Sequence, residues 1–124
     1  MNSIQQVLVA IAAVFAWCGT VAADADNDRA VERGNAHYLV FCANCHGVNG
    51  DGHGPLVELL KVVPTDLTTL VQTGGESLAE RVLKALDGRH QVGEGEQHKM
   101  PVFTQNLEVR TIIEITDYLK TIQK

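Results

Sequence analysis

The chain of 124 residues is poor in the residues on which several protein classes depend. It has three cysteines, three prolines, two methionines and one tryptophan, and only 5% of its residues are aromatic. Its formal net charge is −5, so it lacks the basic excess that would attract nucleic acid or an anionic membrane surface. No internal repeat is present, and no segment alternates apolar and polar residues as a strand would. These absences favour one small, acidic, all-α domain.

Charged side chains are absent from the first 23 residues. Val7–Trp17 is an unbroken apolar run, and the small residues that follow it are typical of a secretory leader cleaved after Ala23, with Ala25 as a second site. We therefore expect a signal peptide at 1–23, a domain at 24–124 and a periplasmic or otherwise exported protein. Because no Lys or Arg precedes the apolar run, the alternative is an uncleaved anchor that holds the domain at the membrane, facing the periplasm.

Removal of the leader would leave two cysteines, Cys42 and Cys45, and one methionine, Met100. Exported proteins normally use cysteines in disulfides, but a bridge between residues three apart closes almost no loop and stabilises almost nothing. The two thiols must therefore have another role.

Helical periodicity and helix-end signals divide the mature chain. A first helix is predicted over Asp28–Asn44, a short one within Leu56–Val63, and a last one over Asn106–Thr121. The best-marked helix begins at Ser77, where Ser-x-x-Glu forms a capping box, and ends at Gly88. Its expected buried stripe is Leu78, Val82, Leu83 and Leu86. The long loops between these helices are unusual in a compact domain unless something organises them.

The run Cys42-Ala43-Asn44-Cys45-His46 predicts what organises them. Two thiols one helical turn apart can add to the two vinyl groups on one edge of a haem, and the histidine that follows can ligate the iron. Cys-x-x-Cys-His is the attachment pattern of c-type haem. The sequence therefore predicts one covalent haem c, with His46 as an iron ligand.

Two other readings of the cysteine pair remain as alternatives. A zinc site would need a second pair of ligands, and the other histidines are scattered without metal-ligand spacing. A thioredoxin-like dithiol would need a strand before Cys42, whereas that flank reads as helix. Haem attachment is favoured over both.

Met100 is the candidate for the second axial ligand of the iron. It lies in a polar loop, has no apolar stripe to join, and is followed by Pro101, which restricts the local backbone. His90 and His98 are rival ligands in the same loop, and packing of Met100 into the core is the other alternative. Met/His ligation would raise the reduction potential and close both axial positions.

At these motifs the chain resembles the class I cytochromes c across most of its mature length. Gly34 and Tyr38 stand at the family's offsets before the first haem cysteine, and Tyr118 is similar to the aromatic on the last helix. The resemblance implies that Gly34 lets the first and last helices cross closely and that Tyr38 and Tyr118 pack beside the crossing. The resemblance implies the cytochrome c fold, with about four helices and long loops around one covalently bound haem.

Three further features are implied by the same resemblance. The Pro55 carbonyl would accept the Nδ1 proton of His46, and Phe103, in a run similar to the family's Met-Pro-x-Phe, would pack against the haem. Pro64–Leu67 resembles the family's Pro-x-Asp-Leu turn. One departure is the absence of tryptophan from the mature chain, since many members place one near a haem propionate.

The function implied is one-electron transfer between larger redox proteins. Expected partners are a dehydrogenase, an oxidase or a cytochrome complex, with no nucleic acid and a membrane only if the leader is retained; we expect a monomer. No residue pattern indicates an acid–base or nucleophilic catalyst, so the protein is not expected to be an enzyme. The alternative is a ligand-binding haem protein, a gas sensor or weak peroxidase, in which Met100 is labile.

Overall fold

A computed structural model of the chain describes residues 24–60, 63–72, 75–89 and 100–124. These fall into two units, residues 1–30 and residues 31–124. In the first unit the described residues, 24–30, are helical, and Arg29 forms an exposed ion pair with Asp26 at 3.3 Å. The predicted leader lies outside the described residues and stays a prediction. Among the residues described, no helix is both long enough and apolar enough to cross a bilayer.

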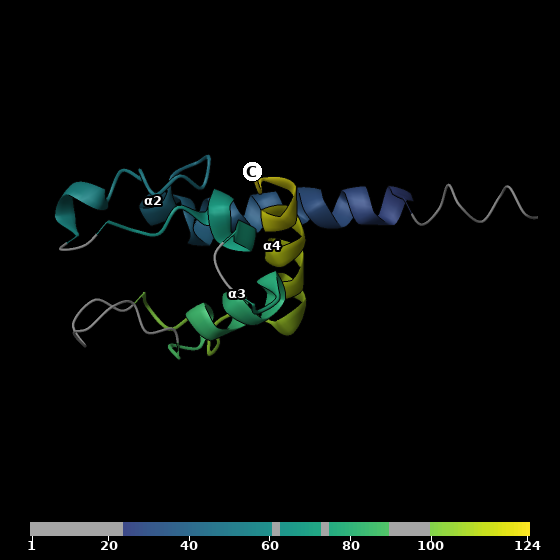
Figure 1. The fold of residues 1–124 in the computed structure, drawn as a ribbon. Helices are drawn as coiled ribbons and strands as arrows, with labels where there is room; N and C mark the ends of the chain where they lie inside the picture. The colour runs from purple at the N-terminus through teal and green to yellow at the C-terminus, as the bar shows by residue number, and fades with distance from the viewer. Residues whose placement is uncertain (1–23, 61–62, 73–74, 90–99) are drawn as a thin grey trace, which may run out of the picture. The chain divides into compact units, whose positions relative to one another are not determined.

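All regular structure described in the second unit is helical (Figure 1). No strand occurs in the described ranges, and the predicted all-α fold is confirmed. The elements in chain order are helical residues 31–41, α2 (Ala43–His46), the 3₁₀ helices η1 (Val57–Leu59) and η2 (Leu67–Gln72), α3 (Leu78–Leu86) and α4 (Val109–Thr121).

Three predicted boundaries differ from the structure, and the first is the start of the first helix, since residues are helical from 24 rather than from Asp28. The first helix does not run unbroken to Asn44, because the helical residues end at 41 and α2 starts at Ala43. The last helix begins at Val109 rather than Asn106, because the Asn106 and Leu107 amides donate to the Phe103 carbonyl in a separate turn.

Helix α3 forms where local signals predict it. The Ser77 hydroxyl accepts from the Glu80 amide at 3.3 Å, and the Glu80 carboxylate accepts from the Ser77 amide at 3.1 Å, which completes the capping box. After the helix, Gly88 adopts a φ of +80°, which favours glycine. The predicted stripe is wrong at Leu83, which is 43% exposed. Only one narrow face of the helix reaches the core, and that face carries Leu78, Val82 and Leu86.

The helical segment 31–41 crosses α4 at Gly34. A Cβ atom at this position would lie 2.6 Å from the Glu114 carbonyl carbon and 3.0 Å from the Tyr118 Cβ, so a side chain cannot be accommodated without moving a helix. Beside the crossing, the rings of Tyr38 and Tyr118 lie with their centroids 5.2 Å apart. The packing roles predicted for Gly34, Tyr38 and Tyr118 are confirmed.

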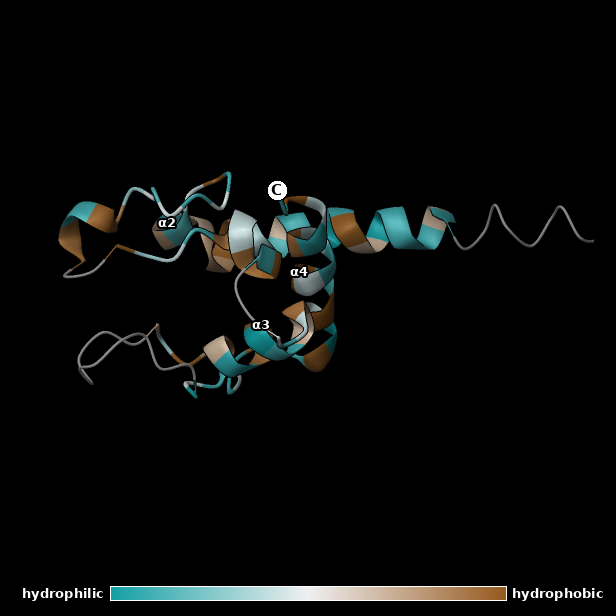
Figure 2. Cartoon of the chain, in the orientation of Figure 1, coloured by the Kyte–Doolittle hydropathy of each residue, from teal (hydrophilic) through white to brown (hydrophobic). Residues whose placement is uncertain are grey.

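One hydrophobic core joins these elements. Along α3 and α4 hydrophobic and hydrophilic residues alternate around the helix, so that each presents one apolar face (Figure 2). The two helices pack against each other. The buried core residues are Tyr38, Cys42, Ala43, Leu70, Leu78, Val82, Leu86, Leu107, Ile115 and Leu119.

Candidate functional site

The cysteine–histidine motif is wound into a single turn. The Cys42 carbonyl accepts from the Cys45 amide at 3.1 Å and from the His46 amide at 2.9 Å. Cys42 is buried, Cys45 is partly exposed, and both thiols are free. Helix α2 and Cys42, which caps its start, therefore present two thiols and an imidazole from five consecutive residues.

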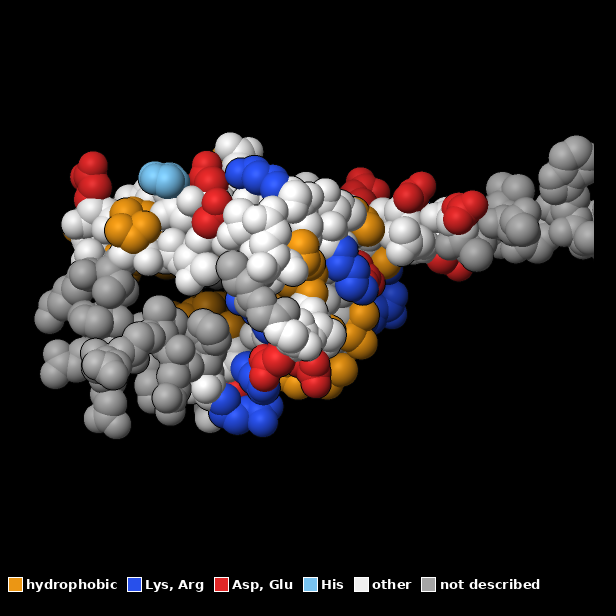
Figure 3. Space-filling view, viewed as in Figure 1, with side chains coloured by type: hydrophobic (Ala, Val, Ile, Leu, Met, Phe, Trp, Pro, Cys, Tyr) orange, Lys and Arg blue, Asp and Glu red, His pale blue; other side chains and the backbone are white. Residues whose placement is uncertain are grey.

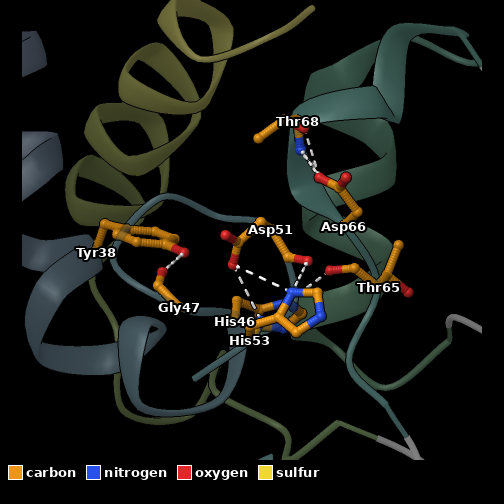
Figure 4. A network of polar contacts seen from close by, with 8 residues as sticks. All are labelled: Tyr38, His46, Gly47, Asp51, His53, Thr65, Asp66 and Thr68. Carbon is orange, nitrogen blue, oxygen red and sulfur yellow. Dashed lines mark hydrogen bonds and ion pairs between the residues drawn. The ribbon is translucent and has the colours of Figure 1, made fainter. Parts of the chain in front are cut away.

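His46 is held in one orientation by a backbone carbonyl. The residue is only 8% exposed, and its Nδ1 lies 3.0 Å from the Thr65 carbonyl oxygen (Figure 4). A carbonyl can only accept, so Nδ1 carries the proton and Nε2 keeps its lone pair. Burial lowers the pKa of His46, and the Thr65 hydrogen bond opposes this only in part. The ring is therefore neutral near pH 7, with Nε2 free to ligate a metal.

The acceptor of this hydrogen bond is not the predicted one. Pro55 is exposed. The His46 Nδ1, which was predicted to donate to the Pro55 carbonyl, pairs with the Thr65 carbonyl instead. The cause lies at Gly54, the residue before Pro55. The Gly54 amide donates to the Cys45 carbonyl at 3.1 Å, and a Cβ at Gly54 would lie 2.6 Å from the Cys45 carbonyl carbon. This segment is thus packed on the backbone of α2, and the later turn supplies the carbonyl.

Further hydrogen bonds tie the residues after His46 in place. The Tyr38 hydroxyl donates to the Gly47 carbonyl at 2.6 Å, and the Gly52 amide donates to the His46 carbonyl at 2.8 Å. Tyr38 is fully buried, and burial raises the pKa of its phenol above the usual value, so it remains a donor. Sequence reasoning assigned Tyr38 to packing alone and missed its hydroxyl, as it missed Thr65.

Met100 and Phe103 pack against the hydrophobic core that contains Cys42, and both are partly buried. The Phe103 amide donates to the Leu86 carbonyl at 2.8 Å, which fixes this segment to the end of α3. The structure thus brings Met100, Phe103 and Cys42 to one core. The rival ligands His90 and His98 lie outside the described residues.

The Cys42 thiol is poorly suited to zinc or dithiol chemistry. Burial, and to a smaller extent the neighbouring Cys45, raise the pKa of Cys42 to about 12. Its thiol is therefore protonated at neutral pH, whereas zinc binding and disulfide exchange both require the thiolate. Within the described ranges, no three His, Cys, Asp or Glu side chains are grouped to hold a metal ion.

Large apolar side chains flank the motif and remain accessible to solvent. A porphyrin needs an apolar surface, and in the sequence such side chains both precede and follow α2. Together with a free Nε2 on His46 and two unpaired thiols, these residues fit a covalently attached haem. The exposed side chains are Leu39, Val40, Phe41, Val48, Leu56, Leu59, Leu60 and Val63.

Charges on the displayed surface are mixed. Acidic and basic side chains lie near one another on the described part of this face, with no broad field of one sign (Figure 3). Among the described residues, ion pairs join Lys84 to Glu76, Arg89 to Asp87 at 2.5 Å, and Lys120 to Asp117 at 2.7 Å. Such pairing reduces the long-range field around the domain.

Comparison with protein families gives one match. The family model described as cytochrome c matches residues 31–123, three quarters of the chain. No curated protein and no solved structure matches it.

Proposed function

Because the chain belongs to the cytochrome c family, we propose that it carries single electrons on one haem c bound covalently through Cys42 and Cys45. Membership itself supports a haem-binding electron carrier with covalently held iron porphyrin. The observation that carries the finer proposal is the pairing of His46 with Thr65, because it directs the free Nε2 lone pair to a metal.

Each residue of the site has a separate part in this proposal. The thiols of Cys42 and Cys45 would hold the porphyrin through its two vinyl groups. His46 Nε2 and the Met100 sulfur would ligate the iron, and Phe103 would pack on the porphyrin. When bound, the haem iron supplies the one-electron change between Fe(III) and Fe(II). With both axial positions filled, small molecules such as oxygen would have no open site.

The surroundings of His46 suit electron transfer, which is fastest when little moves. The ring is buried and hydrogen-bonded, and the buried Tyr38 holds the next residue through its carbonyl. A ligand fixed in this way stays in place in both oxidation states. The apolar residues beside α2 would exclude water and so help to set the reduction potential.

We also propose where this carrier acts and what it meets. The leader pattern supports export to the periplasm, and the partners would be a dehydrogenase, an oxidase or a cytochrome complex. Because opposite charges are interspersed on the face in Figure 3, we expect association rates that change only weakly with ionic strength. A steep salt dependence with every candidate partner would contradict this surface assignment.

The central test uses the full chain, produced in a host that attaches haem outside the cytoplasm. Mass spectrometry should find one porphyrin per chain and no free thiol at Cys42 or Cys45. The oxidised protein should show the far-red charge-transfer band of methionine–iron ligation, and the reduced protein should not bind carbon monoxide. A colourless protein with both thiols free would overturn the proposal, whereas ready carbon monoxide binding would indicate a ligand-binding haem protein.

Variants then assign the axial ligands. His46→Ala should abolish the low-spin spectrum. Met100→Ala should lower the reduction potential and admit carbon monoxide, while Val102→Ala, at a neighbouring position that is 46% exposed, should change neither. If Met100→Ala leaves ligand binding unchanged, the distal ligand lies elsewhere.

A further inference from the structure

We propose that Asp66 is a positioning residue for His46: it holds the Thr65 carbonyl against Nδ1 and so tunes the reduction potential of the haem. This inference rests on the proposed function, since it concerns the same histidine. Asp66 neither touches the ring nor would ligate iron. It acts through the carbonyl of the residue before it.

The first step is the pairing of Asp66 with Thr68. One oxygen of the carboxylate accepts from the Thr68 amide at 2.8 Å and from the Thr68 hydroxyl at 2.5 Å (Figure 4). Thr68 is only 4% exposed, so water cannot readily replace these bonds. The two hydrogen bonds also lower the pKa of Asp66, which keeps the acceptor charged at neutral pH.

The second step is that Thr68 is itself a fixed point. Its carbonyl accepts from the Lys124 amide at 2.8 Å, and the Gln123 side chain donates to the Leu67 carbonyl at 2.8 Å. The Leu67 amide donates to the Gly50 carbonyl at 2.7 Å, which ties the start of η2 to the segment after His46. Asp66 therefore links the fixed helix η2, through its carboxylate, to the Thr65 peptide that precedes it.

The third step is that Thr65 has little else to hold it. Thr65 is exposed, and its side chain forms no hydrogen bond with the described residues. On its other side the Pro64 carbonyl lies against Gly52, where a Cβ would come within 2.5 Å. That contact limits movement of the Pro64 carbonyl toward Gly52 but not movement away from it. The Asp66–Thr68 pair is a polar restraint that begins at the residue directly after the carbonyl that His46 uses.

The expected effect on the haem has a definite sign. Donation from Nδ1 to a carbonyl increases electron density on the imidazole, which favours Fe(III) and lowers the potential. Loosening Thr65 should therefore raise the potential. Loss of the negative charge of Asp66 should raise it as well, so the test must separate position from charge. The basic groups that act on Asp66 are Lys124 and then His53.

The test compares Asp66→Asn with Asp66→Ala in the full haem-loaded chain. Asparagine keeps an oxygen that can accept from Thr68 but carries no charge, whereas alanine removes both. Two quantities are measured: the reduction potential by voltammetry, and the solvent exchange of the His46 Nδ1 proton by NMR. We expect alanine to raise the potential more than asparagine does, and to speed proton exchange while asparagine leaves it slow.

Equal potentials in the two variants, with slow exchange in both, would overturn the positioning role. Should the alanine variant fail to fold, Thr68→Val provides the same test with the charge intact. It should give a smaller rise in potential and faster exchange, and a change in neither would overturn the proposal. A wild-type chain without attached haem would instead contradict the proposed function, so the two failures are distinguishable.

Discussion

Two regions of the molecule are held together by different means. Where residues 31–41 cross α4, shape dominates: Gly34 permits backbone contact, and the rings of Tyr38 and Tyr118 pack beside it. Around His46, single hydrogen bonds to backbone carbonyls dominate. The helix crossing is thus a unit of close backbone and ring packing, whereas the residues around His46 form a polar scaffold arranged around one imidazole. Tyr38 belongs to both.

The helix crossing also contains a buried charge. The side chain of Glu114 is only 7% exposed and lies 2.7 Å from Arg33, 3.0 Å from Arg110 and 3.3 Å from His37. Since a buried carboxylate without partners is strongly unfavourable, these contacts make the charge tolerable and select one register between the two helices. Near His46 the corresponding carboxylate is Asp66, which is only partly buried and accepts from the amide and hydroxyl of Thr68 instead of from basic side chains.

The largest effect should come from a side chain at the crossing. Gly34→Leu should lower the free energy of unfolding by about 3 kcal/mol, because overpacking forces the helices apart. Gly75→Ala is the control, since a Cβ there meets no atom of the described residues within 4 Å. Urea denaturation of the haem-loaded variants measures both. Equal stabilities would mean that the crossing is not a packing unit.

A smaller effect should come from removing the buried charge. The hydrogen bonds from Arg33, and then Arg110, hold the pKa of Glu114 below its usual value. A depressed pKa contributes stability above the ordinary glutamate pKa, and that contribution is lost as the pH falls through the lowered value. Glu114→Gln should therefore destabilise the protein at pH 7 and flatten its acid unfolding profile.

The control for this variant is Glu76→Gln, which breaks a solvent-exposed pair with Lys84. Exposed pairs contribute little, so its stability and its pH profile should stay close to those of the wild type. If stability depends on pH in the same way in both variants, the ion pairs of Glu114 contribute no more to stability than an exposed pair does.

The smallest effect should come from the hydroxyl that links the two regions. Tyr38→Phe removes one buried hydrogen bond to Gly47 and should cost about 1 kcal/mol. Tyr118→Phe should cost less, because the structure shows no hydrogen bond from that hydroxyl to the described residues. Thermal unfolding of both variants tests the link, and equal losses would place Tyr38 in the packing unit alone.

Sequence patterns predicted features whose cause is local. The capping box of Ser77 and Glu80 and the helix stop at Gly88 involve residues at most a few positions apart, and both are confirmed. The exposure of Leu83 was missed because periodicity gives a helix face but not its width. The haem motif is equally local, and the family match supports the haem that it predicts.

The missed features depend on contacts between distant residues. Thr65 reaches His46 from 19 residues away, through a backbone carbonyl that any residue type could supply. Arg110 and Glu114 are four residues apart on one helix, as an i,i+4 ion pair requires. Arg33, however, also donates to Glu114 and lies 81 residues before it in the sequence. One signal was available: an aspartate two residues before a threonine favours a capped turn, and Asp66 and Thr68 form one.

The hydrogen bond from Phe103 to the Leu86 carbonyl bears on how much insertion and deletion this protein can tolerate. The bond joins two residues 17 positions apart, so it holds the two ends of the intervening segment together whatever the length of that segment. Doubling a closed loop costs only about 0.6 kcal/mol of chain entropy. Relatives could therefore lengthen or shorten this span, and so reshape the surface beside Met100, while Phe103 keeps its place at the end of α3.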